Sequence, residues 1–548
     1  MGGGVVHQCK HPANALALGL ARGAGQTRGQ CRMPKRKNRH IAVGGQLPPR
    51  FLPAERVQTV QRGGHVHIAN GSTGFPLGCA WKQQGRILTT PSHAMHLVTV
   101  VSQRPRHRGI ELSDAAAVGR EGGCNAQTHA AIWGKNRSAP TYLRFMNAYL
   151  VDGVRTPIGS FGGTLSPIRT DDLAAHALRS LVERHPNLDP MMIGDVLMGC
   201  ANQAGEDNRN VARMASLLAG LPQEVPAETI NRLCASGLAA SVHASRMLHM
   251  GDAQVVLAGG VEHMTRGPWV LSKASKPFGR DMELHDTSFG WRFINPRLDA
   301  LYGTEGMGQT AENLVDLHHI SREDQDAFAY RSQMKAAAAQ KEGRLAEELV
   351  SVSIPQRKKD PISFEADEFI KPGTTPEILA KLRPAFRKEG GTVTAGNASG
   401  LNDGAAALLL ANEDGLKSQG LEPLARMVSS AVVGVPPRIM GIGPVEASNR
   451  ALAKAGIGFD DLDVIELNEA FAAQSLACIR SWNLADDDAR INPNGGAIAL
   501  GHPLGMTGAR ILLAAARQLQ RTGGKHGLVT LCIGVGQGYA AVIENVQR

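Results

Sequence analysis

The sequence predicts an α/β protein in which sheets and helices are stacked in layers. Over residues 146–548, short apolar runs typical of strands buried on both faces alternate with amphipathic helices. The runs are residues 255–258, 406–410, 464–465 and 528–531. A helix capped by residues 170–172 is expected next to them, because Leu173, Ala177 and Leu181 would share one face. This alternation indicates that helices cover the faces of the sheets.

The chain has 548 residues, which is too long for one hydrophobic core, so two or three domains are expected. Its charge is distributed unevenly. Residues 1–145 hold 20 Lys+Arg and 4 Asp+Glu, whereas residues 146–548 hold 39 and 45. The net charge of +10 therefore comes from the first segment. No apolar run approaches the roughly 18 residues of a membrane-spanning helix, so no membrane partner is expected.

Residues 1–145 are predicted to be a basic leader of low order. The first 50 residues contain no acidic residue, and no helical or strand period is sustained. A basic arm for nucleic acid, best represented by residues 33–40, is one interpretation, and an organelle transit peptide is another. We favour a third, in which the start was placed too early and the segment is a non-native extension. Nucleic acid is therefore not expected as a partner.

Cysteine usage indicates the compartment. Eight cysteines without a CxxC pair are too few for a disulfide scaffold, so a reducing, cytoplasmic location is expected. The four cysteines and nine histidines of residues 1–145 show no metal-ligand spacing. No metal site is therefore expected.

Residues 146–548 are expected to contain two related halves, 146–415 and 416–548. The similar segments are 195–202 with 463–470, and 229–237 with 530–538. In the second pair, each strand is expected to run into a cysteine, a glycine and then a helix. Two such halves that face each other would bring both cysteines to one site. A charged, irregular stretch at 266–388 is interpreted as an inserted loop domain over a cleft, or as solvated loops.

The two cysteines, Cys234 and Cys532, are candidates for chemistry. Small residues after Cys234 permit a sharp turn from strand to helix, and the helix N-terminus would stabilise a thiolate. Cys532 lies in the glycine-rich stretch 531–538, where backbone can approach a ligand closely. A buried inert cysteine and a tight turn are the alternative interpretations.

His502 and Asn468 are the polar candidates. His502 lies in residues 492–505, whose Gly and Pro predict an ordered loop from which a side chain can reach a cleft. Asn468 follows a buried strand, and α/β sheets place ligand contacts at the carboxyl ends of such strands. A structural histidine and a helix N-cap are the alternatives for these two residues. The four candidates together are more specific than any one alone.

Together these motifs resemble the thiolase family of acyl-CoA C-acyltransferases. The similarity runs from residues 151–159 to the C-terminus and includes residues 259–264 and 394–404, while the leader has no counterpart. The resemblance implies two similar five-stranded mixed-sheet domains in a layered α-β-α-β-α arrangement with an inserted loop domain. It also implies a homodimer or homotetramer, coenzyme A as co-substrate, and no bound cofactor.

The resemblance also implies roles for the candidate residues. Cys234 would be the nucleophile that carries the acyl group as a thioester, activated by His502. Cys532 would be the second acid and base, a task for which a thiol pKa needs little tuning. Enolate charge would be held by His502 and a water bound to Asn468. The tetrahedral oxyanion would be held by the backbone N–H groups of Cys234 and Gly534.

Further residues are matched to substrate and CoA binding. Ser399 matches a residue that contacts the pantetheine arm of CoA. Acetoacetyl-CoA thiolases usually carry a His-Met-Gly triplet, and here Gly306 replaces the histidine before Met307. Met307 remains a candidate for substrate contact, and the glycine indicates room for a longer acyl chain.

Residues 199–210 and 290–296 resemble the thiolases that cleave 3-oxoadipyl-CoA in aromatic degradation. That substrate ends in a free carboxylate. Arg209 or Arg292 is a candidate to pair with it, because Arg offers a fork of donors that matches a carboxylate. The alternative for either residue is an ordinary ion pair within the protein.

The main hypothesis is therefore a degradative thiolase that splits a 3-oxoacyl-CoA, expected to be 3-oxoadipyl-CoA, with CoA into acetyl-CoA and a shortened acyl-CoA. An acetyl-CoA C-acetyltransferase that forms or cleaves acetoacetyl-CoA is the alternative within the family. A ketoacyl synthase typically uses one cysteine and two histidines, and the position of Cys532 and the Gly-His-Pro motif argue against it. Nucleic-acid binding through residues 1–145 is the alternative from a different class.

Overall fold

The computed structural model describes residues 82–83, 86–87 and 146–547. The chain divides into two units, Met1–Gly122 and Gly123–Arg548. In the first unit, β1 (Lys82–Gln83) pairs with β2 (Arg86–Ile87) in antiparallel fashion. The other predictions for the basic leader, including nucleic-acid binding, concern residues outside those described. Within the described part of the chain, no helix is both long and apolar enough to cross a membrane.

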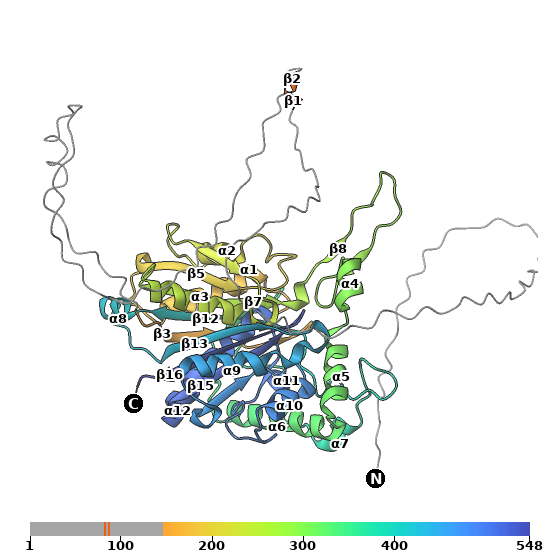
Figure 1. Ribbon diagram of the computed structural model, residues 1–548. Coiled ribbons are helices and arrows are strands. Elements are labelled where there is room, and N and C mark those ends of the chain that lie inside the picture. The colour runs from red at the N-terminus through yellow and green to blue at the C-terminus, as the bar shows by residue number, and fades with distance from the viewer. Residues whose placement is uncertain (1–81, 84–85, 88–145, 548) are drawn as a thin grey trace, which may run out of the picture. The chain divides into compact units, whose positions relative to one another are not determined.

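A mixed ten-stranded sheet runs through the second unit (Figure 1). Its strands are β3 (Tyr149–Arg155), β4 (Gly159–Ser160), β5 (Ile193–Gly199), β6 (Ala227–Ile230), β7 (Val255–His263), β12 (Asn402–Ala411), β13 (Ala425–Gly434), β14 (Val464–Leu467), β15 (His526–Ile533) and β16 (Gln537–Asn545). They lie in the order β14-β15-β16-β13-β3-β12-β7-β5-β6, and β4 pairs with β12. The four apolar runs predicted as strands lie in β7, β12, β14 and β15, so that prediction is confirmed.

The sheet has two halves, which meet at a short contact. There β3 pairs with β13 only through Leu150 with Ala425 and Tyr149 with Arg426. The N-terminal half has five strands along the path, β3, β12, β7, β5 and β6. The C-terminal half has four, β13, β16, β15 and β14, because the segment beyond β14 forms a single parallel bridge between Ile465 and Ile491 instead of a strand. The α/β class and the mixed sheets are confirmed, while the strand count differs in this half.

Helices form layers on both sides of the strands (Figure 1). They are α1 (Thr170–Glu183), α2 (Val211–Leu218), α3 (Ser236–Met250), α8 (Glu413–Gln419), α9 (Gly443–Ala455), α10 (Ala472–Ser481), α11 (Ala497–Leu500) and α12 (Leu504–Thr522). In β7, Val256 and Ala258 pack in the same core cluster as residues of α3 and α12. Val255 and Leu257 instead pack with residues of α1 and α2. This period of two places α3 and α12 between the sheets and α1 and α2 outside.

The start of α1 differs from the prediction. Its N-cap is Arg169, which makes no capping hydrogen bond, and Thr170 is already helical. The backbone N–H of Thr170 donates to Glu206 Oε2 at 3.2 Å, so a distant carboxylate replaces the expected local cap. Leu173, Ala177 and Leu181 are fully buried, as their spacing predicted.

The stretch 266–388 is more regular than expected. Its elements are β8 (Trp269–Leu271), β9 (Leu284–Asp286), α4 (Pro296–Tyr302), α5 (Met307–His318), α6 (Arg322–Lys341), β10 (Val352–Ile354), β11 (Ile362–Phe364) and α7 (Pro376–Ala380). The expectation of irregular structure is wrong for α5 and α6, which pack against α10. The Ser321 side chain caps α6 by accepting from Asp324 N, a local signal that the charged sequence obscured.

Candidate active site

Cys234 lies at a sharp junction between β6 and α3. The 3₁₀ turn Leu233–Ala235 runs directly into α3. Leu233 adopts a φ of 46°, which is uncommon for a residue with a Cβ. Its backbone N–H donates to Asn231 Oδ1 at 2.9 Å, and this contact stabilises the turn. The strand-to-helix turn expected around Cys234 is therefore present.

Two backbone N–H groups face the sulfur of Cys234, its own and that of Gly534. Burial raises the pKa of the Cys234 thiol, and these two donors offset part of that rise. The expectation of a stabilised thiolate is therefore wrong. Cys234 rests as a neutral thiol and needs a base to become a nucleophile.

Cys532 lies on β15, directly before the turn into β16. The predicted order of strand, cysteine, glycine and helix is wrong in this half, because the chain turns back into a strand through Val535 (φ 63°) and Gly536 (φ 83°). Burial, followed by the neighbouring Cys234, raises the pKa of Cys532 well above its ordinary value. The two cysteines thus lie close together, but the Cys532 pKa is strongly perturbed, contrary to expectation.

His502 is held by contacts on both ring nitrogens and on its backbone. Nδ1 lies 2.8 Å from Thr507 Oγ1, and Nε2 lies 3.3 Å from Asn468 Nδ2. The Thr507 hydroxyl donates its single hydrogen to Pro503 O at 2.8 Å. It must therefore accept from Nδ1–H, which leaves the lone pair on Nε2. The backbone N–H of His502 donates to Asn402 Oδ1 at 3.1 Å.

The environment keeps His502 neutral. Burial, and then the charge of Arg510, lowers the pKa of His502 to about 3. The Nε2 lone pair accepts from the Asn468 amide, and a neutral imidazole with its lone pair on Nε2 can also accept a proton from a thiol. Thr507 and Asn402 were not predicted from the sequence as site residues. A hydroxyl one turn into the helix after a candidate histidine was the available signal for Thr507.

Asn468 links strand β15 to His502. It follows β14, and its backbone N–H donates to Thr530 O on β15 at 3.0 Å. The N-cap alternative is wrong, because the N-cap of α10 is Phe471 and the Asn468 amide points to His502. Asn468 Oδ1 is buried and has no hydrogen-bond partner among the described residues. It is available to a water molecule or ligand.

Ser399 and Met307 lie beside these elements. Ser399 Oγ donates to Ala470 O at 3.1 Å, which places it next to the segment of Asn468. Met307, the first residue of α5, packs against the small apolar cluster that contains Cys532. Its sulfur lies 3.6 Å from the position that a Cβ would take on Gly534.

The two candidate arginines differ in how they are held. Arg292 is half-buried, and its Nη2 donates to Asn202 Oδ1 at 2.8 Å. Arg209 is exposed and has a φ of 62°. Within residues 146–547 neither side chain forms an ion pair with a carboxylate, so the alternative of an ordinary internal ion pair does not apply there.

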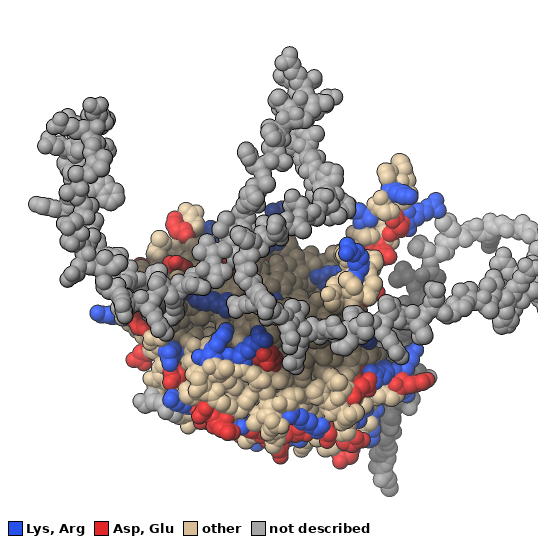
Figure 2. Space-filling model, in the orientation of Figure 1, with Lys and Arg blue, Asp and Glu red and all other residues tan. Residues whose placement is uncertain are grey.

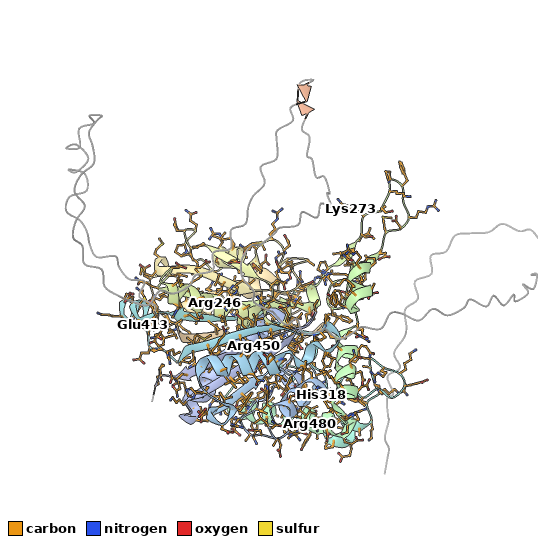
Figure 3. The ribbon with its side chains drawn as sticks, viewed as in Figure 1. Arg246, Lys273, His318, Glu413, Arg450 and Arg480 are labelled. Atoms are coloured by element: carbon orange, nitrogen blue, oxygen red, sulfur yellow. The ribbon has the colours of Figure 1, made fainter. Side chains whose placement is uncertain are left out.

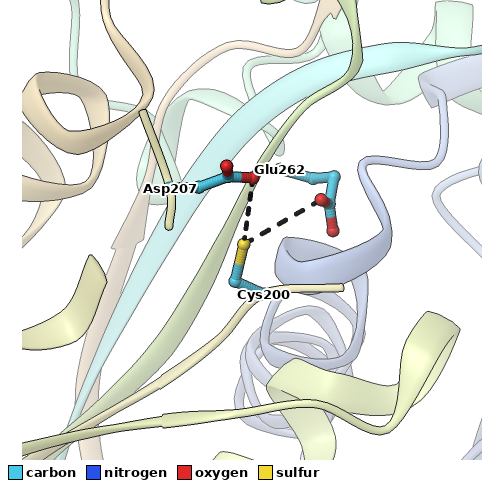
Figure 4. Close-up of side chains that lie close together, drawn as sticks. All are labelled: Cys200, Asp207 and Glu262. Carbon is cyan, nitrogen blue, oxygen red and sulfur yellow. Dashed lines mark hydrogen bonds between the residues drawn. The ribbon is translucent and has the colours of Figure 1, made fainter. Parts of the chain in front are cut away.

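One group of side chains in residues 146–547 has the composition of a metal site, Cys200, Asp207 and Glu262 (Figure 4). Cys200 Sγ lies 3.5 Å from Asp207 Oδ2 and 4.0 Å from Glu262 Oε1. Burial raises the pKa of the Cys200 thiol well above its ordinary value. All four carboxylate oxygens of the group accept backbone N–H groups. The backbone N–H groups therefore occupy the carboxylate oxygens that would bind a cation, and a protonated thiol is a poor metal ligand. The group does not suit a metal ion.

Comparisons with known proteins agree with this geometry. The thiolase N-terminal domain model matches residues 148–414, and the thiolase C-terminal domain model matches residues 421–545. The chain is 54% identical over 400 residues to a beta-ketoadipyl-CoA thiolase of Acinetobacter baylyi, covering 73% of this chain and all of that protein. It is 56% identical over 399 residues to a 3-oxoadipyl-CoA/3-oxo-5,6-dehydrosuberyl-CoA thiolase of Escherichia coli K12. This match covers 73% of this chain and 99% of that protein. A crystal structure of Bacillus anthracis acetyl-CoA acetyltransferase matches with a TM-score of 0.68 and 40% identity, covering 74% of this chain and 100% of that one.

Proposed function

The chain belongs to the thiolase family of acyltransferases, and from this premise we propose that it cleaves 3-oxoadipyl-CoA with CoA. The products are acetyl-CoA and succinyl-CoA, and the intermediate is a succinyl thioester on Cys234. The proposal is supported by the grouping of Cys234 with Cys532 and Gly534, together with the contact between His502 and Asn468. CoA is a co-substrate, and no bound cofactor or metal is required.

The first half of the reaction begins at Cys234. His502 Nε2 takes the thiol proton, and the sulfur attacks the 3-oxo carbon of the substrate. The backbone N–H groups of Cys234 and Gly534, which face the sulfur, hold the oxyanion that forms. The C2–C3 bond then breaks, which leaves succinyl on Cys234 and the enolate of acetyl-CoA.

Cys532 ends the first half by donating its thiol proton to C2 of the enolate. The enolate oxygen is held by the protonated Nε2 of His502 and by a water bound to Asn468 Oδ1. In the second half, CoA attacks the thioester and its thiol proton passes to the Cys532 thiolate. Cys234 recovers its proton from His502 as succinyl-CoA leaves. Cys234, His502 and Cys532 are therefore all neutral at rest, so none of the three leaves a buried charge between turnovers.

Three observations support 3-oxoadipyl-CoA as the substrate. Relatives that are 54% and 56% identical carry beta-ketoadipyl-CoA or 3-oxoadipyl-CoA in their names. Apart from Gly306 itself and its two neighbours in the chain, no described atom lies within 4 Å of a Cβ built on Gly306, which leaves space for a longer acyl chain. Arg292 is held by Asn202 and has no carboxylate partner in residues 146–547, so it is available to the distal carboxylate. We favour it over Arg209, whose exposed side chain has no such support.

Substrate preference tests the proposal. The kcat/KM for 3-oxoadipyl-CoA is expected to exceed that for 3-oxohexanoyl-CoA, its uncharged analogue of equal length, by about tenfold or more. Arg292→Gln is expected to remove most of that preference and to leave the 3-oxohexanoyl-CoA reaction nearly unchanged. Arg209→Gln is the matched control and is expected to retain the preference. A higher kcat/KM for acetoacetyl-CoA would instead support the acetyltransferase alternative.

Thr507 provides a second prediction. In Thr507→Val the hydroxyl that accepts from His502 Nδ1–H is lost, so the imidazole is no longer fixed with its lone pair on Nε2. We expect kcat to fall by about tenfold, since one buried hydrogen-bond partner is removed. Thr507→Ser keeps the hydroxyl and is expected to restore most of the activity. Wild-type kcat in Thr507→Val would contradict the role assigned to this contact.

The proposal includes a homodimer or homotetramer in the cytoplasm. Large apolar side chains are exposed along the segment of β8 and β9, which projects from the layers (Figure 1): Trp269 is 72% exposed, Phe278 103% and Leu284 62%. Figure 3 labels Lys273 on the same segment. An exposed apolar surface of this kind supports self-association. The four described cysteines are free, which supports a reducing compartment.

The charged surface gives no support to a nucleic-acid function for residues 146–547. In Figure 2, Lys and Arg are interspersed with Asp and Glu over the visible face of these residues. Several of the exposed arginines are paired with carboxylates, among them Arg438 with Glu305 and Arg450 with Glu446. A continuous basic stripe, the usual footprint of nucleic-acid binding, is not visible on this face.

A further inference from the structure

Glu262, near the end of β7, receives backbone hydrogen bonds from two separate loops. Its Oε2 accepts from Ala201 N at 3.0 Å and from Gly505 N at 2.8 Å, and its Oε1 accepts from Asn202 N at 3.0 Å. The residue is 1% exposed. Among residues 146–547 no cation forms an ion pair with this carboxylate, and its side-chain neighbours include Asp207 and Cys200. These three N–H groups therefore provide its stabilisation.

The first of the two loops carries the base. Gly505 is the second residue of α12 and lies three residues after His502. The Glu262 carboxylate thus sits at the N-terminus of a 19-residue helix, where the helix dipole favours negative charge. Any shift of this helix end also moves the backbone from which His502 projects.

The second loop follows β5 and lies beside the nucleophile. Ala201 O accepts from Asn231 Nδ2 at 2.9 Å, and Asn231 Oδ1 in turn accepts from the backbone N–H of Leu233, next to Cys234. On the other side, Asn202 holds Arg292. Glu262 therefore joins the turn of the nucleophile, in the N-terminal half, to the loop of the base, in the C-terminal half.

Burial raises the pKa of Glu262 to about 7, so above that pH, where a thiol ionises, its negative charge acts against the nucleophile. Burial is the main cause that raises the pKa of Cys234, and the negative charge of Glu262 raises it further. A neutral acceptor would make the thiol easier to ionise. A carboxylate in this place is consistent with a positioning task, because only its two oxygens can accept three N–H groups that arrive from different directions.

We propose that Glu262 is a positioning residue for acyl transfer, which fixes the distance between Cys234 and His502 by tying their two loops to one carboxylate. The proposal rests on the catalytic roles given above to these two residues. It does not depend on the identity of the acyl group. It can therefore be tested by exchange of labelled CoA with acetyl-CoA, which requires acyl transfer only.

Glu262→Gln distinguishes the positioning effect of Glu262 from the effect of its charge, because the two effects change different measurements. The amide keeps one acceptor oxygen, so at least one of the three N–H groups loses its partner and the two loops are no longer tied to each other. We expect the exchange rate to fall by about tenfold to a hundredfold. At the same time, the pH profile of Cys234 alkylation by iodoacetamide is expected to shift to lower pH, because a negative charge has been removed. General structural damage would not produce a lower exchange rate together with a Cys234 thiol that ionises at lower pH.

Asp207→Asn is the matched control. Asp207 belongs to the same buried group, but its carboxylate accepts from Gln203 N and Gly205 N, which both lie in its own loop. This variant is expected to keep the wild-type exchange rate and alkylation profile, even if its melting temperature falls as much as that of Glu262→Gln. Glu262→Asp is a further variant, which keeps the carboxylate but draws it back by one methylene group from the three N–H donors. It is expected to lose exchange activity while the pH profile of Cys234 alkylation stays as in the wild type.

Three outcomes would overturn the proposal. They are wild-type exchange in Glu262→Gln, equal losses in Glu262→Gln and Asp207→Asn, and wild-type exchange in Glu262→Asp. If Glu262→Gln does not fold, the exchange rate of Glu262→Asp still tests whether Glu262 is a positioning residue. Failure of the proposed function would look different, because wild-type protein would then show no exchange activity at all.

Discussion

Cys234→Ser is expected to lower the rate of thiolysis by roughly 10⁴-fold or more, the scale seen when a nucleophile is removed from an active site. The serine hydroxyl would still receive the N–H groups of Gly534 and Cys234. However, His502, whose pKa is lowered to about 3 by burial, is too weak a base to ionise a hydroxyl. The measurement is kcat with 3-oxoadipyl-CoA, together with a search for the acyl-enzyme.

Cys478→Ser is the control for this substitution. Cys478 is also a buried, free cysteine, but its Sγ bonds Gly441 O at 3.3 Å and no step is assigned to it. We expect this variant to turn over at close to the wild-type rate. Retained thiolysis in Cys234→Ser would refute the assignment of the nucleophile.

Cys532→Ala is expected to separate the two halves of the reaction. Cleavage of 3-oxoadipyl-CoA should fall by about 10²- to 10⁴-fold, since the proton donor to C2 of the enolate is missing. Exchange of labelled CoA with acetyl-CoA should persist within a few-fold, because no enolate forms in that reaction. Cys532 then stays protonated, and His502 passes the proton between Cys234 and the CoA thiol. The two rates are measured on the same preparation, so that a misfolded sample would lose both.

The opposite patterns would contradict the role of Cys532. Equal losses in cleavage and exchange would mean that Cys532 supports the architecture around Cys234 rather than proton transfer. Unchanged cleavage would mean that another group or a water molecule supplies the proton.

Much of the fold and the identity of the main site residues could be predicted, because both are encoded locally. Each strand that was expected is a short apolar run, and β7 and β12 are buried along their whole length. Cys234, His502 and Cys532 each lie in a stretch of small residues that marks a tight turn. The cap of α1 could not be predicted, since its partner Glu206 lies 36 residues away.

The electrostatics of the site could not be predicted from local sequence. A thiol at a helix N-terminus indicates a lowered pKa, but the burial that reverses this direction for Cys234 appears only after the two halves have packed. Glu262 was missed for the same reason, because the fold brings its partner Gly505 to it from 243 residues away. Thr507 is different, since it lies five residues after His502 and its hydroxyl was a local signal.

The most direct test of the account is mass spectrometry of the full-length protein after it is mixed with 3-oxoadipyl-CoA in the absence of CoA. The account predicts one succinyl group per chain, located on the peptide that contains Cys234, and its loss as succinyl-CoA when CoA is added. It also predicts no such group in Cys234→Ser. A succinyl group on another residue, or acetyl-CoA release with no modified cysteine, would contradict it.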